Sequence, residues 1–348
     1  MLRSASSWRQ LLLPLAVLSV VVLLDIVLGP QVVISGSFAM AAVVASVFTS
    51  VRATALTASL AVAFAALSGF WNGNIGTLAW SVRLWLGALL GGLAVLTAEI
   101  RVRRERELSR MTVIADAAQQ ALLRAMPQSV GSVGFAARYV SATEAAKVGG
   151  DLYEVTETPF GVRVVLGDVR GKGLEAVQMA ATVLASFRRA AFLQESLSGV
   201  AAEMDSVVTA VAEPEDFVTA LLAEFHEDGT VTFVNCGHPA PLLVPSAGPA
   251  DELDTGAPQL PLGFGTAGNA VTVAWPATAR LLLFTDGLVE TRNLTGAFFP
   301  LSDQATILSS GSLEEALDNL LNQLRGYAHQ RLGDDIALVL AEQRTPAS

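Results

Sequence analysis

The sequence predicts an α+β protein that begins with an apolar helical region. Hydrophobic residues make up 52% of the 348 residues and charged residues only 16%, against about 25% in an average soluble domain. This charge deficit is not spread evenly, because only six charged residues fall before residue 100. Beyond about residue 133, short β patterns are interleaved with amphipathic helical patterns, which is typical of an α+β layered fold.

The apolar region contains four segments, at about 11–29, 32–50, 54–71 and 77–99. Each is close to the ~20 residues that a helix needs to cross a bilayer. We therefore expect residues 1–100 to form a four-helix transmembrane domain in the lipid bilayer. Arginines precede the first segment, separate the second from the third and follow the fourth. This pattern predicts a multi-pass protein of the cell membrane with both termini in the cytoplasm.

Residues 101–127 are predicted to form a helical connector. Apolar residues recur there at steps of three and four, at Leu108, Met111, Ile114, Ala118 and Leu122, and Pro127 is expected to end the helix. Two interpretations stay open. The stripe packs on the following domain, or it forms a parallel coiled coil that makes a homodimer and carries signals from the membrane.

Charge and composition exclude several functions. Residues 1–110 carry nine arginines and four acidic residues, a net charge of +5. Because the whole chain has a net charge of −10, the remainder carries −15. An acidic domain repels nucleic acid, and we expect no nucleic-acid partner. A single cysteine, Cys236, allows no intrachain disulfide. With only three histidines, none before His226, neither a multi-histidine zinc site nor a phosphoacceptor histidine on the connector is expected.

The remaining residues, 128–348, are predicted to form the cytoplasmic domain. We expect a buried strand at 162–169, helices at about 171–192 and 196–211, and a hairpin turning at Asp228-Gly229. A strand in RLLLFTDG, a helix in LEEALDNLLNQLRGYAH and a final strand in IALVLAE follow.

Aspartates stand beside glycines at the ends of these predicted strands. Asp151 follows two glycines, Asp168 and Asp286 close buried strands, and Asp334-Asp335 precedes the last strand. Carboxylates without histidine or cysteine partners suit hard cations such as Mg²⁺ or Mn²⁺. A lone Asp-Gly pair is more often a turn, so the set indicates a site only if the fold brings its members together.

These motifs, in order, resemble the PPM (type 2C) metal-dependent protein phosphatases, specifically the SpoIIE/RsbU branch. The matches run from about residue 115 to 342: ALLRAMP, VGGDLYE, LGDVRGKGLEA, DFVTALLAEF, VNCGHPAPLLV, LPLGF, LLLFTDGLVETRN and GDDIALVL. The resemblance implies an α/β-β/α sandwich, with two antiparallel sheets packed face to face and helices outside.

The resemblance also implies a site with two Mn²⁺ or Mg²⁺ ions. Asp168 matches the carboxylate that bridges both ions, with the Val169 carbonyl as an adjacent ligand. Asp151 and Asp286 match two further ligands, and the last is Asp334 or Asp335, with alignment favouring Asp334. The implied reaction is hydrolysis of phosphoserine or phosphothreonine by an activated water. The implied substrate is a phosphorylated anti-sigma-factor antagonist.

Some positions depart from the branch pattern. Arg170 stands where serine is usual, and it either contacts substrate phosphate or faces solvent. For His238, a structural role is favoured over a general-acid role because glycine and proline flank it. The alternative function is a weak or inactive membrane-tethered module that binds a phosphoprotein without cleaving it.

Overall fold

The structure is a computed structural model that describes residues 4–29, 32, 34–141, 149–266, 268–329 and 332–344. The chain divides into two compact units, Met1–Arg110 and Met111–Ser348. The first unit is helical. Its elements are α1 Ser4–Leu28, the 3₁₀ helix η2 Ser35–Phe38, α2 Ala39–Phe48, α3 Val51–Trp71 and the start of α4, Leu78–Leu122.

Three of these helices, α1, α3 and α4, are long and apolar enough to cross a membrane, the first over Leu11–Leu28. The second predicted segment is shorter, because α2 has only ten residues. The Ser-Gly-Ser run before it forms η2 instead of α-helix, as expected of residues with low helix propensity.

The buried Asp25 ties the helices of the first unit together. Its carboxylate accepts hydrogen bonds from the Ile34 backbone N–H at 2.9 Å, from Trp71 Nε1 at 3.1 Å and from Asn72 Nδ2 at 3.0 Å. Asp25 thus has its hydrogen-bond partners within the first unit. A buried carboxylate needs such donors, because it would otherwise lose its hydration without compensation.

The second unit is a sandwich of two antiparallel sheets, as the resemblance implies. The six-stranded sheet has the order β1 Ser129–Val130, β2 Val133–Val140, β11 Ile336–Gln343, β10 Ala279–Phe284, β7 Leu242–Pro245 and β8 Asp251–Glu252. The five-stranded sheet has the order β3 Leu152–Thr158, β4 Gly161–Val169, β5 Val218–Phe225, β6 Thr230–Cys236 and β9 Ala270–Ala274.

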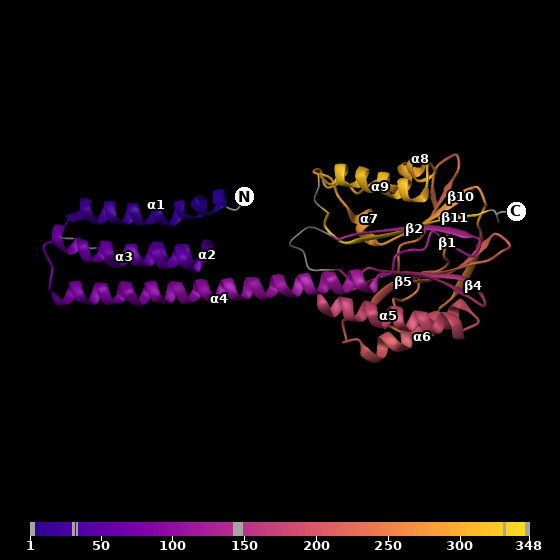
Figure 1. The fold of residues 1–348 in the computed structure, drawn as a ribbon, viewed down its shortest axis with the longest axis horizontal. Helices are drawn as coiled ribbons and strands as arrows, with labels where there is room; N and C mark the ends of the chain where they lie inside the picture. The colour runs from indigo at the N-terminus through magenta and orange to yellow at the C-terminus, as the bar shows by residue number, and fades with distance from the viewer. Residues whose placement is uncertain are drawn as a thin grey trace. The chain divides into compact units, whose positions relative to one another are not determined.

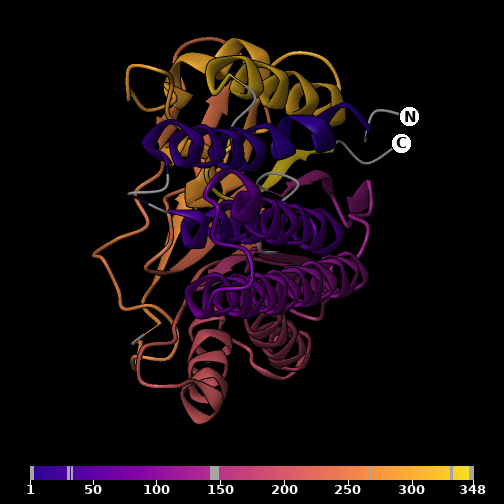
Figure 2. The ribbon, with the colours of Figure 1, turned by 90° about the vertical axis from the view of Figure 1, so that its left-hand side faces the viewer.

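Helices cover the outer faces of the sandwich. They are α5 Leu174–Leu193, α6 Leu197–Val211, α7 Asp286–Glu290, the 3₁₀ helix η3 Leu301–Gln304, α8 Ala305–Leu308 and α9 Leu313–Tyr327. Within this unit, Figures 1 and 2 show α5 and α6 against one sheet and α9 against the other. The predicted strand 162–169 and both predicted helices that follow it are confirmed within a few residues.

The core of this unit lies in three layers. Between the sheets, side chains such as Phe135, Leu166, Phe233, Leu281 and Val339 are fully or almost fully buried. A second cluster joins the five-stranded sheet to α5 and α6, and a third joins the six-stranded sheet to α9. Burial of apolar surface on both faces of each sheet is the main stabilising term of such a fold. The packing of the two sheets on each other also determines which strand ends lie close together at each end of the sandwich.

Candidate active site

The strand pairing brings the predicted aspartates to one end of the sandwich. In the five-stranded sheet, Leu152 pairs with Gly167, so Asp151 lies beside Asp168. In the six-stranded sheet, Phe284 pairs with Leu338, so the end of β10 lies beside the start of β11. Asp286 opens α7 two residues after β10, and Asp334-Asp335 leads into β11.

Thr285 connects the two sheets at this end. Its hydroxyl donates to Asp151 Oδ2 at 2.7 Å and accepts from the Ala337 backbone N–H at 2.9 Å. Tyr139, on β2, donates from its hydroxyl to Asp335 Oδ2 at 3.1 Å. Four chain segments that are distant in sequence therefore share one hydrogen-bonded cluster.

Glycines let these segments approach so closely. A Cβ on Gly149 would overlap the Asp335 carboxylate, and a Cβ on Gly287 would overlap the Asp335 carbonyl. A Cβ on Gly150 would overlap the carbonyl of Val169, whose own N–H donates to the Gly150 carbonyl at 3.3 Å. The glycines beside the aspartates thus have a steric reason that follows from the packing.

Burial, and after it mutual repulsion, raises the pKa values of the aspartates in the cluster. Burial raises the pKa of Asp151 well above its usual range, and the Asp168 charge adds to this. Burial and the Asp286 charge raise the pKa of Asp168 to about 7. Burial, with the charges of Glu290 and Asp334, also raises the pKa of Asp286. Buried carboxylates that repel one another are stabilised by cations.

Lys172 supplies a positive charge that sequence analysis did not single out. Its ammonium lies 2.6 Å from Asp334 Oδ1. Burial lowers the pKa of Lys172, but the Asp334 hydrogen bond and the surrounding carboxylates raise it by more. The residue lies between Gly171 and Gly173, which both have positive φ. This glycine-lysine-glycine turn after β4 was the available signal in the sequence.

Arg170 points toward the start of β5. Its guanidinium binds the carbonyl of Glu215, lies 3.4 Å from the Glu215 carboxylate and stacks 5.5 Å from the centroid of the Phe217 ring. Its side chain is half exposed. The structure thus gives Arg170 a packing partner, and its role toward a substrate stays a prediction.

His238 is held on both ring nitrogens. Nε2 lies 3.1 Å from the Phe284 carbonyl, which only accepts, so Nε2 carries the proton. Nδ1 then accepts from the Thr219 hydroxyl at 3.0 Å. Burial lowers the pKa of His238 to about 3. A neutral ring with a hydrogen bond at each nitrogen supports the structural role over general acid catalysis.

The donor set fits Mg²⁺ or Mn²⁺ in kind, because every candidate ligand is an oxygen. Close approach by glycine backbone leaves room for no Cβ at three positions of the cluster. Across the described part of the chain, however, no group of three or more His, Cys, Asp or Glu side chains is close enough to hold one ion. The fit is therefore one of donor chemistry and charge.

The fold and the acidic cluster define a PP2C-type phosphatase domain. The solved structures similar to this chain include the following three. The RsbU and RsbW domains of a Mycobacterium tuberculosis protein share 25% identity at a TM-score of 0.52, over 62% of this chain and 61% of that one. The SiaA PP2C domain of Pseudomonas aeruginosa gives 18% and 0.57 over 71% and 98%. The PP2C domain of Bacillus subtilis SpoIIE with a regulatory fragment gives 16% and 0.50 over 62% and 64%.

The sequence model of the family SpoIIE, Stage II sporulation protein E, matches residues 158–344. This is more than half of the chain, and the chain belongs to the SpoIIE family. It spans less than two thirds of the first of the similar structures, 61% of its length. The two structures below 25% identity support the fold alone.

Proposed function

We propose that this chain is a membrane-anchored serine/threonine protein phosphatase. The observation that carries the proposal is the meeting of five aspartates from four chain segments at one end of the sandwich. Asp151, Asp168, Asp286 and Asp334 or Asp335, with the Val169 carbonyl, would hold two Mn²⁺ or Mg²⁺ ions. Such ions supply water activation and offset the charge of a phosphoryl group.

The residues around the cluster would prepare it for this chemistry. Thr285 fixes the Asp151 carboxylate, and Tyr139 fixes that of Asp335. Lys172 is placed to exchange Asp334 for the phosphate of a substrate, because its ion pair is partly exposed. No covalent intermediate is needed, since water is the proposed nucleophile.

The proposed substrate is a phosphorylated anti-sigma-factor antagonist. Its support is membership of the SpoIIE family and the likeness to an RsbU domain. The proposed anchor is a four-span domain over 1–100 with both termini cytoplasmic, followed by a connector at 101–127 and the phosphatase domain at 128–348. Three long apolar helices support the anchor. Exposed Met111, Val113 and Ile114 on α4 support a homodimer through the connector.

A phosphoprotein-binding module without turnover is the second candidate. It is favoured by one observation, the ion pair between Lys172 and Asp334, which occupies a proposed ligand. A module of this kind would bind a phosphoserine peptide equally well with and without Mn²⁺.

The deciding experiment measures phosphate release from a phosphoserine peptide by the full chain in lipid nanodiscs, with and without Mn²⁺. We expect Mn²⁺-dependent release that Asp168→Asn abolishes. Asp303→Asn, a change at an exposed aspartate in η3, should leave release unchanged. Absence of release by the wild-type chain, with retained peptide binding, would support the binding module instead.

A further inference from the structure

A buried glutamine on α4 contacts the backbone of the candidate active site. Gln119 is only 1% exposed. Its Nε2 donates to the carbonyl oxygen of Asp151 at 3.2 Å. Its Oε1 is buried and has no hydrogen-bond partner among the described residues. Half of this side-chain amide is therefore bonded to a proposed ligand residue, and the other half is unsatisfied.

The surroundings of Gln119 on α4 are apolar. Ala115 and Ala118 pack against Val177 of α5, and Leu122 packs against the core beneath α5. Helical spacing places Gln119 on the same face as Ala115 and Leu122, so an apolar side chain would extend this contact. A buried, half-satisfied amide is less favourable for folding than an apolar side chain of the same shape. The fold alone thus gives no reason for glutamine at this position.

Asp151 is the point at which this helix meets the acidic cluster. Its carbonyl accepts from Gln119, while its carboxylate accepts from Thr285 of the opposite sheet. Because α4 is one continuous helix from Leu78 to Leu122, Gln119 belongs to the helix that also forms the last apolar segment.

We propose that Gln119 is a positioning residue that fixes the Asp151 backbone to α4, so that the placement of α4 sets the divalent-ion affinity of the site. This inference rests on the proposed phosphatase function and adds its regulation. A partner that displaces α4 breaks the bond between Gln119 and Asp151 and lowers ion affinity without touching any carboxylate.

The test compares Gln119→Met with Gln120→Met in the full chain in lipid nanodiscs. Methionine keeps the length of the side chain and removes its donor. Gln120 is the matched control, because it is exposed and its amide donates to Asp116 on the same helix at 3.2 Å. Bound Mn²⁺ is measured by electron paramagnetic resonance of the free ion, and thermal unfolding and phosphate release are measured in parallel.

Gln119→Met is expected to weaken Mn²⁺ binding by about tenfold, as the loss of an outer hydrogen bond to a ligand residue does in other metal sites. Its melting temperature should equal or exceed that of wild type. Gln120→Met should match wild type in both. Unchanged or tighter Mn²⁺ binding by Gln119→Met would overturn the inference alone, and so would a markedly lower melting temperature. A wild-type chain that binds no Mn²⁺ and releases no phosphate would overturn the proposed function and this inference with it.

Discussion

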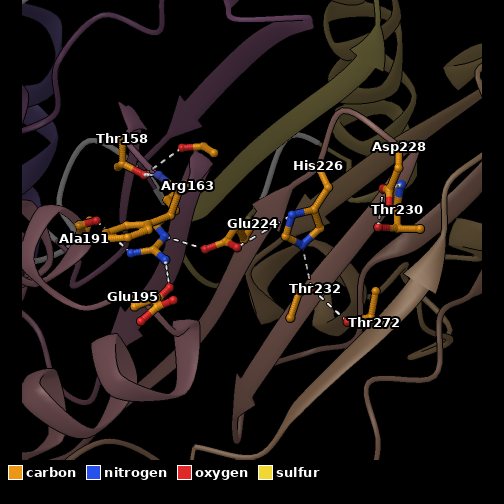
Figure 3. A network of polar contacts seen from close by, with 12 residues as sticks. Thr158, Arg163, Ala191, Glu195, Glu224, His226, Asp228, Thr230, Thr232 and Thr272 are labelled. Carbon is orange, nitrogen blue, oxygen red and sulfur yellow. Dashed lines mark hydrogen bonds and ion pairs between the residues drawn. The ribbon is translucent and has the colours of Figure 1, made fainter.

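Replacing the buried Arg163 of β4 tests what holds the turn between α5 and α6. Its side chain is 0% exposed, and Nε lies 2.5 Å from Glu224 Oε2 on β5. Its other nitrogens donate to the carbonyls of Ala191 at 2.7 Å, Gln194 at 2.6 Å and Glu195 at 2.6 Å. Figure 3 shows this guanidinium between the end of α5 and the sheet. One side chain thus satisfies a carbonyl in the last turn of α5 and two carbonyls just after it, and it neutralises a buried carboxylate.

The magnitude follows from what Arg163→Met leaves behind. Glu224, only 8% exposed, keeps a buried charge without its partner. Breaking a buried ion pair from one side costs about 3–5 kcal/mol. Since about 1.4 kcal/mol is a tenfold change in an equilibrium constant, opening of this region should become about a thousandfold more frequent. Adding Glu224→Gln should recover at least about 1 kcal/mol, because the unpaired charge is then removed.

Amide hydrogen exchange of the full chain in nanodiscs measures this opening, read on peptides from β4 and β5. Arg138→Met is the control. Arg138 makes a bidentate pair with Asp318 at 2.7 and 2.9 Å, but the two side chains are 31% and 55% exposed. An exposed pair contributes about 0–1 kcal/mol, so exchange should rise by about fivefold or less. Exchange in Arg163→Met that stays within fivefold of the control would refute the reasoning.

Three further predictions concern the same domain. Folding lowers the His238 pKa from about 6.5 to about 3, so the stability that the neutral ring contributes is complete above about pH 6.5 and is lost as pH falls toward 3. In urea unfolding, the free energy of unfolding of wild type should therefore fall by about 3 kcal/mol more than that of His238→Gln by about pH 4.5. Parallel pH profiles of the two proteins would contradict this. Burial raises the pKa of Cys236 to about 11, so mass spectrometry should find Cys236 unmodified by iodoacetamide in the native chain and modified in urea. Rapid modification of the native chain would contradict this and would show that the core around Cys236 opens. Gly149→Ala should lower phosphate release by at least about tenfold, because the new Cβ displaces Asp335. Gly326→Ala in α9 is the control and should leave release unchanged, because the space around its new Cβ is open. Equal activity of both variants would refute the steric argument.

The regular elements of the phosphatase domain could be predicted from the sequence because their signals are local. The alternating pattern and the Asp228-Gly229 turn predict the β5–β6 hairpin, which the structure confirms. The fourth apolar segment and the connector, however, form one helix, α4. Ion pairs between Arg101 and Glu105 at 2.8 Å and between Glu99 and Arg103 at 2.5 Å continue the helix across the expected boundary. Opposite charges four residues apart stabilise a helix, so this charged run continues α4 and does not end it.

The candidate site could be predicted only in part. Aspartates beside glycines at strand ends can be recognised in a sequence, because glycine there marks a place where a ligand or another backbone segment can approach the carboxylate closely. Thr285 and Gln119 carry no such local signal. Thr285 becomes recognisable only when β10 and β3 meet across the sandwich, and Gln119 only when α4 packs on α5. Such roles depend on tertiary contacts, which the order of residues in one segment does not encode.

The neighbours Asp334 and Asp335 show how the fold separates two residues that the sequence leaves equivalent. Asp335 is 3% exposed and is held by Tyr139. The Asp334 side chain is 47% exposed and pairs with Lys172, an interaction of about 0–1 kcal/mol that a ligand can displace. Of these two proposed ligands, we therefore expect Asp334 to be the adjustable one and Asp335 to maintain the shape of the site. Asp334→Asn should weaken Mn²⁺ binding with unchanged melting temperature, whereas Asp335→Asn should lower the melting temperature as well; the reverse pattern in calorimetry and Mn²⁺ titration would assign the roles the other way round.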